Sequence, residues 1–319
     1  MTDGQTKGLT FVTVTFRAED ALLRLQARSM ARFLDASVVE TIIVIDNGSP
    51  GLGTRARRSL LSEYGVLAPR VRIGRAEELT HLPFASGWTL QQVLKISVST
   101  TVETPWYVLL DAKNHFVRSV ARSDFVTPDG RARGGFHSYA AHPLLPRLRT
   151  TLAYLGLSES LADRFPPTST PFVMNTEVAQ SVIADVADRS GRPFAEEFVK
   201  QNLSEFFLYS GWVARRSGGW SEMLDGEAIQ SPTVWGGAAD GAGVGAALAE
   251  VTRWEAPLFA VHRRALGRLD ASGTAMLADF WTGRELFADE REVRRFLRTA
   301  KRDRVLDAVR SRVRRTVGS

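Results

Sequence analysis

Trp106-Tyr-Val-Leu-Leu-Asp-Ala-Lys-Asn114 is the stretch of sequence that decides the fold. Its first five residues are apolar or aromatic, which is typical of a strand buried on both faces of a parallel sheet. A second such run is Thr41-Ile-Ile-Val-Ile45, and Leu9–Phe16 alternates apolar and β-branched residues. Between these runs, apolar residues recur at helical spacing. The N-terminal third therefore predicts an α/β fold with a mostly parallel sheet flanked by helices.

The regular alternation fades beyond residue 120. The later segments that have a clear pattern are helices at 177–186 and 195–217 and a strand at Leu258–Val261. Within the Gly/Ala-rich stretch 236–247, the segment Gly241–Ala246 has no strong strand before it and predicts a mobile loop. Residues 271–319 end in a charged segment of helical periodicity, so we expect a helical C-terminal extension.

The composition excludes several classes of protein. The chain has 319 residues, of which 44% are hydrophobic and 24% charged, as in an ordinary globular protein. It contains no cysteine, which excludes disulfides, thiolate metal sites and a cysteine nucleophile. The first residues are polar, and no apolar run approaches the ~18 residues of a membrane-spanning helix. We therefore expect a soluble, cytoplasmic protein.

The positive charge is concentrated at the C-terminus. Residues 284–319 hold 12 Lys and Arg against 6 Asp and Glu, which accounts for the whole formal net charge of +6. The neutral remainder argues against nucleic acid as a partner. Arg294, Arg298 and Arg302 recur at helical spacing with apolar residues between them. Those apolar residues are Phe296, Leu297, Val305 and Val309. This basic helix is either solvated or lies on an anionic membrane surface.

Polar residues follow three of the expected strands, at the carboxyl edge where ligands bind in such sheets. They are Arg17 after the first run, Asp46-Asn-Gly48 after the second and Asp111-Ala-Lys-Asn114 after the third. We expect these three loops to converge. Asp111 is the leading candidate, because a carboxylate directly after a buried strand is held rigidly. For both Asp46 and Asp111 the alternative is a plain turn, since aspartate favours turns.

Two helical segments offer further polar side chains. The helix that starts near Trp88 presents Gln92, Lys95 and Ser99 on one face, which either binds phosphate groups or is solvated. Glu205 is a candidate general base, a group that takes the proton from an attacking hydroxyl. The alternative for Glu205 is a helix capping box, because Asn202-Leu-Ser-Glu205 has the required spacing.

Five segments of the chain form a recognisable set. They are Gln91–Lys95, Tyr107–Phe116, Pro171–Asn175, Ser204–Tyr209 and Val261–Arg263. Together they resemble nucleotide-sugar glycosyltransferases of the GT-A type. More narrowly, they resemble an uncharacterised bacterial family grouped with glycosyltransferases that has Asp-Ala-Lys-Asn in place of Asp-x-Asp. The resemblance covers residues 10–265. It implies a GT-A-like, Rossmann-like domain with a nucleotide-binding half at 1–120 and an acceptor-binding half at 121–270, followed by a basic helical tail at 271–319.

The resemblance also implies a function and roles for single residues. The function is transfer of a sugar from a nucleotide-sugar donor to a glycan or other cell-surface acceptor in polysaccharide biosynthesis. The implied residues are catalytic Asp111, Lys113 and Glu205, donor-binding Thr15, Arg17, Asp46, Gln92, Lys95 and Asn114, and acceptor-binding Asn175 and Tyr209. If the acceptor is lipid-linked, we expect the basic tail to contact the inner face of the membrane.

One departure from the resemblance concerns the metal. GT-A enzymes hold a divalent cation on the donor diphosphate with Asp-x-Asp, but the third position here is Lys113. Either Lys113 itself offsets the charge of the nucleoside diphosphate leaving group, or manganese or magnesium is held by Asp111, Asn114 and His262. His262 has its own alternative, a structural position at the end of a strand.

Two other functions stay open on the sequence. Lys113 also fits a non-catalytic nucleotide-sugar-binding or scaffold protein with a degenerate metal motif. The second is a sugar-phosphate nucleotidyltransferase, although the glycine- and arginine-rich loop of that class does not follow Phe16.

Overall fold

A five-stranded, mostly parallel sheet lies at the centre of the computed structural model, which describes residues 8–216 and 219–302. In spatial order its strands are β3 (Val71–Arg75), β2 (Val39–Asp46), β1 (Leu9–Thr15), β4 (Trp106–Asp111) and β6 (Phe172–Asn175). The three apolar runs of the sequence form the adjacent strands β2, β1 and β4, as expected. β6 is antiparallel to β4, with Asn175 opposite Trp106.

A three-stranded sheet brings the C-terminal part of the chain next to β4. Its order is β5 (Asn114–Phe116), β8 (Leu258–Val261) and β7 (Thr233–Val234). β5 follows β4 after a two-residue turn and pairs antiparallel with β8. The backbone N–H of Val261 donates to the carbonyl oxygen of Lys113 at 3.4 Å. The residues after β8 therefore lie beside the turn that follows β4.

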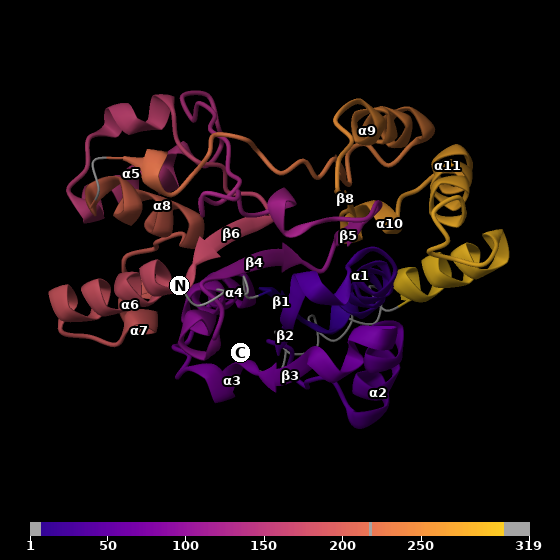
Figure 1. Cartoon of the computed structure of the whole chain (residues 1–319), viewed down its shortest axis with the longest axis horizontal. Coiled ribbons are helices and arrows are strands. Elements are labelled where there is room, and N and C mark those ends of the chain that lie inside the picture. Colours follow the sequence, from indigo (N-terminus) through magenta and orange to yellow (C-terminus); the bar gives the residue numbers. More distant parts are fainter. Residues whose placement is uncertain (1–7, 217–218, 303–319) are drawn as a thin grey trace, which may run out of the picture.

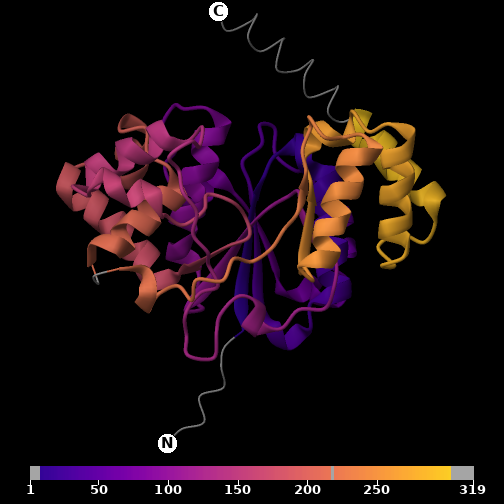
Figure 2. The ribbon, with the colours of Figure 1, turned by 90° about the horizontal axis from the view of Figure 1, so that it is seen from above.

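Helices flank the five-stranded sheet in two groups (Figures 1 and 2). The helices are α1 (Asp20–Phe33), α2 (Thr54–Glu63), α3 (Ala76–Leu79), α4 (Gly87–Ser97), α5 (Leu145–Leu155), α6 (Thr176–Ser190), α7 (Phe194–Lys200), α8 (Glu205–Arg216), α9 (Gly241–Arg253), α10 (Arg263–Leu266) and α11 (Ala271–Thr282). Helices α5 to α8 gather on one side of the sheet and α9 to α11 on the other. The sheet and its flanking helices are the fold class that the sequence predicts.

The loop expected over Gly241–Ala246 is wrong, because these residues form the start of α9. Asp240 caps this helix, since its Oδ1 accepts a hydrogen bond from the Gly243 N–H at 2.8 Å. Ala246, Ala247 and Leu248 follow and are good helix formers. A Cβ at Gly243 would lie 2.3 Å from the Ala238 carbonyl oxygen, so this glycine permits a close approach of two backbone segments. The glycines therefore serve packing at a helix start rather than a loop.

The helix expected over residues 195–217 is divided into α7 and α8. Asn202, between them, has a φ of 51°, in the left-handed region that interrupts a right-handed helix. Its backbone N–H donates to the Val199 carbonyl oxygen at 3.1 Å. The break makes Glu205 the first residue of α8.

The start of the basic tail packs against the rest of the protein. Residues 290–302 are helical and contribute buried apolar side chains. Those side chains are Val293, Leu297 and Ala300. Val305 and Val309, on which the membrane interpretation also depends, lie outside the described residues. Within residues 8–216 and 219–302, no helix has the length and apolar character needed to cross a bilayer.

Candidate functional site

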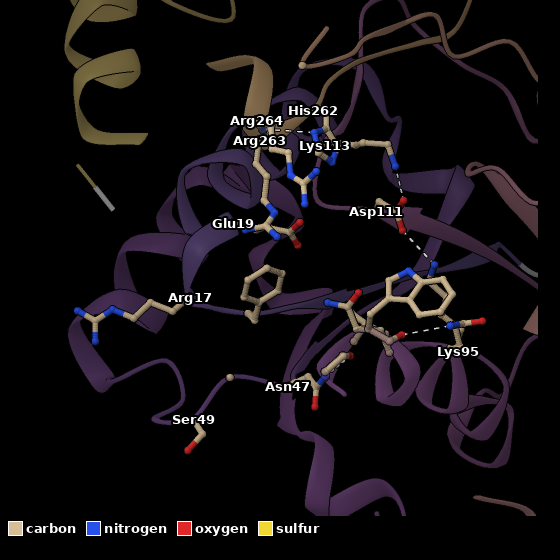
Figure 3. Close-up of a pocket in the computed structure, with 18 of the residues that line it drawn as sticks. Arg17, Glu19, Asn47, Ser49, Lys95, Asp111, Lys113, His262, Arg263 and Arg264 are labelled. Carbon is tan, nitrogen blue, oxygen red and sulfur yellow. Dashed lines mark hydrogen bonds and ion pairs between the residues drawn. The ribbon is translucent and has the colours of Figure 1, made fainter. Parts of the chain in front are cut away.

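A pocket of about 1380 Å³ opens where the carboxyl ends of β1, β2 and β4 meet (Figure 3). The loops after these strands line it with Arg17, Asn47 and Asp111, and α4 and the segments after β7 and β8 complete it. The convergence expected from the sequence is therefore present. Sites for small molecules typically have about 300–1,000 Å³, so this pocket has room for a large ligand or for two ligands together.

Lys95 joins two carboxylates inside this pocket. Its Nζ lies 3.0 Å from Asp111 Oδ1 and 3.3 Å from Glu205 Oε1. The other oxygen of Asp111, Oδ2, accepts a hydrogen bond from Lys113 Nζ. The side chains of Lys95 and Glu205 are 9% and 7% exposed, whereas that of Asp111 is 34% exposed. Glu205, Lys95, Asp111 and Lys113 thus form a row of alternating charges, in which Asp111 is the most exposed member.

Burial and ion pairing have opposite effects on the pKa values of Asp111 and Lys95. Burial raises the pKa of Asp111, but the ammonium groups of Lys113 and Lys95 outweigh burial and hold that pKa well below its ordinary value. Burial lowers the pKa of Lys95, but Asp111 and Glu205 raise it above its ordinary value. Asp111 and Lys95 are therefore ionised at neutral pH. Removing one member of a buried ion pair leaves the other uncompensated, which is strongly destabilising.

The capping-box alternative for Glu205 is wrong. Its carboxylate oxygens contact Lys95 Nζ and, at 3.3 Å, Ser204 Oγ. The Asn202 N–H that a capping box needs is bonded to the Val199 carbonyl instead. The spacing is right, but the left-handed backbone at Asn202 removes it from the start of the helix.

Gln26 of α1 fixes the turn that carries Asp111 and Lys113. It is fully buried, and its Nε2 donates to the carbonyl oxygens of Asp111 at 2.8 Å and Asn114 at 3.0 Å. Its Oε1 accepts from Thr13 Oγ1 of β1 at 2.8 Å. These bonds tie the turn to β1 and α1. Sequence reasoning missed Gln26, because a glutamine within a helix 85 residues before Asp111 carries no pattern of its own.

Glu19 is a second residue that sequence reasoning missed. It ends the short 3-10 turn after β1 and lines the pocket, where Figure 3 shows it between Arg263 and Asp111. Burial, and then the charge of Asp111, raise the pKa of Glu19 to about 7, against the opposing effect of Arg263. No hydrogen bond or ion pair links its carboxylate to another described residue. Glu19 can therefore exchange a proton near neutral pH.

Replacing Glu19 by glutamine is expected to stabilise the ligand-free protein above pH 7 by about 1–2 kcal/mol. The folded state raises the carboxyl pKa from 4.5 to about 7, so its contribution to stability is complete below pH 4.5 and is lost as the pH rises to 7. Glutamine has no proton to lose and removes this loss. Urea unfolding of both proteins from pH 5 to pH 8 measures the effect, and parallel pH profiles would contradict it.

Positively charged side chains gather around the pocket. Four arginines line it and form no salt bridge with any carboxylate of residues 8–216 and 219–302; they are Arg17, Arg263, Arg264 and Arg268. With Lys95 and Lys113 they make six cationic side chains against three carboxylates, a formal charge of +3. Residues 1–283 have no net charge by sequence, but the fold concentrates positively charged side chains around this pocket.

His262 lies beside Arg263 and Arg264, directly after β8. Its Nδ1 accepts from the Arg264 N–H at 3.3 Å and so caps α10. Its ring lies 5.4 Å from that of Trp235, centroid to centroid. Burial, helped by Lys113 and Arg263, lowers the pKa of His262 to about 4, so the ring is neutral at pH 7.

Exposed aromatic rings also line the pocket. Phe84, Trp88 and Trp235 are 105%, 54% and 55% exposed. Nucleobases stack readily on such rings, because every base has a flat π-face. The sequence shows these aromatic residues but not their exposure, so it does not distinguish them from core residues.

Comparison with known proteins relates the chain to a sequence family. Residues 16–235 match DUF6492, described as a family of unknown function. The chain belongs to DUF6492. A search of curated proteins found no match.

Solved structures resemble this DUF6492 member in fold. WbbM, described as a bifunctional glycosyltransferase and solved in its apo form, has a TM-score of 0.52 and 11% identity, covering 88% of this chain and 51% of its own. An active-site mutant of LgtC has a TM-score of 0.44 and 11% identity, covering 64% of this chain and 69% of its own. The galactosyltransferase LgtC with donor and acceptor sugar analogues has a TM-score of 0.40 and 11% identity, covering 62% and 72%. The likeness to WbbM confirms the GT-A-like α/β fold.

Seven of the predicted site residues line the pocket of this DUF6492 member. They are Arg17, Gln92, Lys95, Asp111, Lys113, Glu205 and His262. The other five do not line it. They are Thr15, Asp46, Asn114, Asn175 and Tyr209.

Asp46 and Thr15 lie behind the pocket lining, since both are buried. The Asp46 carboxylate accepts from the Gly48 N–H at 2.9 Å and lies 3.0 Å from Arg75 Nη1. It organises the loop after β2, as the turn alternative expects. Thr15 is 1% exposed, and its neighbours Val14 and Phe16 line the pocket instead.

Asn114 uses its whole amide group inside the protein. Its Oδ1 accepts from the Asp111 N–H at 2.9 Å and from Thr170 Oγ1 at 2.8 Å. Its Nδ2 donates to the Thr170 carbonyl oxygen at 3.2 Å and to Ser231 Oγ at 3.0 Å. An amide has two acceptor and two donor positions, so none is left for a donor molecule or a metal.

Asn175 and Tyr209 lie at the opposite edge of the sheet. Because β6 is antiparallel, its carboxyl end faces the start of β4 rather than Asp111. Asn175 Oδ1 caps α6 by accepting from the Val178 N–H at 3.1 Å, and its own N–H donates to Tyr209 Oη at 2.9 Å. The resemblance placed them with the acceptor, but their observed contacts belong to helix capping and packing.

Proposed function

We propose that this protein transfers a sugar from a nucleotide-sugar donor to a glycan or other cell-surface acceptor. The observation that carries the proposal is the pocket at the carboxyl ends of β1, β2 and β4, whose positive charge and exposed rings suit a nucleoside diphosphate and its sugar. WbbM, which shares the fold, is described as a glycosyltransferase, and this supports the same class of reaction.

Arg17, Gln92 and Lys95 are the predicted donor-binding residues that line the pocket. The Oε1 atom of Gln92 is buried with no partner among the described residues. A buried acceptor without a partner costs free energy, which a hydroxyl or N–H group of the donor would remove. We therefore assign Gln92 to donor recognition.

In the reaction, the bond between the anomeric carbon and the diphosphate oxygen breaks while the acceptor oxygen forms a new bond to that carbon. Negative charge grows on the diphosphate as it leaves, and cations placed beforehand stabilise that transition state. Lys113 fits this role, and Asp111 holds both Lys113 and Lys95 in place. Binding both substrates in one pocket aligns the reacting atoms.

For the proton of the acceptor hydroxyl, we assign Glu19 in place of Glu205. Glu205 is paired with Lys95, so proton uptake would break a buried ion pair. Glu19 has a pKa of about 7, and a general base works best when its pKa lies near the working pH. Glu205 then acts as a positioning residue through Lys95.

The test is binding of a panel of nucleotide sugars, measured by thermal shift and calorimetry. A ligand at 100 times its Kd raises stability by about 2.7 kcal/mol, which such a screen detects. Trp235→Ala is expected to weaken binding about tenfold, because a stacking ring is lost. Trp254→Ala is the matched control, since Trp254 is 42% exposed and does not line the pocket. If no nucleotide sugar binds, the proposal fails.

Binding without transfer is a second candidate function, which Lys113 in the place of an acid favours. A transferase and a binding protein are distinguished by their products. With the best-bound nucleotide sugar and a cell-envelope glycan extract, a transferase releases the nucleoside diphosphate and labels the glycan, whereas a binding protein leaves the donor intact.

Three further expectations stay predictions from the sequence. They are the division into donor and acceptor halves, the cytoplasmic location, and the contact of the basic tail with a membrane that carries a lipid-linked acceptor. The pocket itself takes side chains from both expected halves, with Asp111 from the first and Glu205 from the second.

A further inference from the structure

We infer that the donor diphosphate is bound by lysine and arginine side chains of this pocket, principally Lys113, Arg263 and Arg264, and that no divalent cation takes part. This inference rests on the proposed function, and it resolves the choice between lysine and metal that the sequence leaves open. Two observations support it. The atoms of Asp111, Asn114 and His262 that a cation would need are already bonded within the protein, and the side chains around them carry positive charge.

Asp111 is the leading metal ligand of the sequence prediction. Both of its carboxylate oxygens accept hydrogen bonds from ammonium groups, Oδ1 from Lys95 and Oδ2 from Lys113. A divalent cation at Asp111 would have to displace these groups or lie within a few ångströms of two positive charges. Like charges at that distance repel strongly in a partly buried site.

Asn114 and His262, the other two expected metal ligands, are engaged within the protein. The amide oxygen of Asn114 is fully buried and already accepts two hydrogen bonds. The Nδ1 atom of His262 caps α10, and two arginines follow it directly in the sequence. Among residues 8–216 and 219–302, no group of three or more His, Asp and Glu side chains is arranged to hold a metal ion. The side chains present therefore do not fit a magnesium or manganese site.

Side chains of the protein supply the positive charge that a divalent cation would bring. The pocket has a formal charge of +3, and its four arginines form no salt bridge with a carboxylate of residues 8–216 and 219–302. The diphosphate of a nucleotide sugar carries one negative charge on each phosphate at neutral pH. Arginine binds phosphate through several N–H donors at once, so these side chains suit such a ligand.

The fold explains why the cations meet at this point. The hydrogen bond from the Val261 N–H to the Lys113 carbonyl oxygen fixes the end of β8 against the turn after β4. Arg263 and Arg264 follow two and three residues later, on the same side of the pocket as Lys113 (Figure 3). Two segments about 150 residues apart thus form one cationic wall.

The experiment is calorimetric titration of the full chain with a panel of nucleoside diphosphates, in EDTA and again with manganese or magnesium. We expect the tightest ligand to bind with a Kd that differs by less than about threefold between these conditions. Arg264→Gln is expected to weaken this binding about tenfold and to reduce its dependence on salt. Arg253→Gln is the matched control, an exposed arginine of α9 outside the pocket.

Asp111→Asn adds a second test, in which a metal site and a site of lysines and arginines predict opposite effects on affinity. If cations of the protein bind the diphosphate, loss of this negative charge leaves affinity in EDTA unchanged or tighter. Binding that requires the metal, and that Asp111→Asn abolishes while the variant stays folded by circular dichroism, overturns the inference and leaves the proposed function intact. If no nucleoside diphosphate binds under either condition, both this inference and the proposed function are wrong. If Asp111→Asn does not fold, the inference is tested by Arg264→Gln, whose substitution lies at an exposed position. Unchanged affinity of Arg264→Gln for the nucleoside diphosphate would then contradict it.

Discussion

Replacing Lys95 by methionine is expected to slow the proposed sugar transfer strongly and to lower the free energy of unfolding by about 3–5 kcal/mol. Methionine keeps the length of the side chain but removes the ammonium group that lies 3.0 Å from Asp111 and 3.3 Å from Glu205. Glu205 is 7% exposed, so its charge would remain buried without its cation. The loss of a positioned charge from the site is expected to slow transfer about a hundred- to a thousandfold.

Urea unfolding and donor turnover measure the two effects of Lys95→Met. Lys200→Met is the control, because Lys200 lies exposed at the end of α7. Adding Glu205→Gln to Lys95→Met is expected to restore about 1–2 kcal/mol of stability, because it removes the uncompensated charge, but not transfer. If Lys95→Met unfolds like the wild type, the ion pairs contribute nothing and this account is wrong.

Replacing Gln26 by leucine is expected to lower the free energy of unfolding by about 3 kcal/mol or more. The change leaves the buried carbonyl oxygens of Asp111 and Asn114 and the hydroxyl of Thr13 without the partner that Gln26 supplies. Donor binding is expected to weaken as well, because the turn that carries Asp111 loses its attachment to α1. A protein held only by apolar packing at this point would tolerate leucine, which is close in volume.

The control for Gln26→Leu is Gln180→Leu. Gln180 is exposed on α6, and its Nε2 donates one hydrogen bond, to the Ser99 carbonyl oxygen at 2.8 Å. Its loss is expected to cost no more than about 1 kcal/mol. Chemical unfolding ranks the two variants, and equal values would remove the special role assigned to Gln26.

Sequence patterns predicted the strands that build the pocket but not every residue at its surface. The runs that became β1, β2 and β4 are apolar because both faces of a central strand are covered, so their burial is visible in composition. Asp111 could be found for the same reason, since it interrupts such a run. The direction of β6 has no such signature, because a short apolar segment has the same pattern whichever way it pairs. Nothing in the sequence therefore shows that Asn175, which the resemblance placed with the acceptor, lies at the opposite edge of the sheet.

Long-range contacts account for the residues that were missed. Glu19 is unusual only beside Asp111 and Arg263, the latter 244 residues away in the chain. Gln26 matters only because the turn after β4 comes to rest on α1. Such juxtapositions come from tertiary packing, which a local pattern does not encode.

The pairing of β8 with β5 places a short, separate segment of the chain against the Asp111 turn. His262 and the arginines after it follow β8 and line the pocket, whereas β1, β2 and β4 come from the first 111 residues. Side chains of this segment can therefore be exchanged without altering the strands that carry the rest of the pocket. Neutral or acidic replacements between β8 and α10 are expected to shift the preference of the pocket toward ligands of lower negative charge.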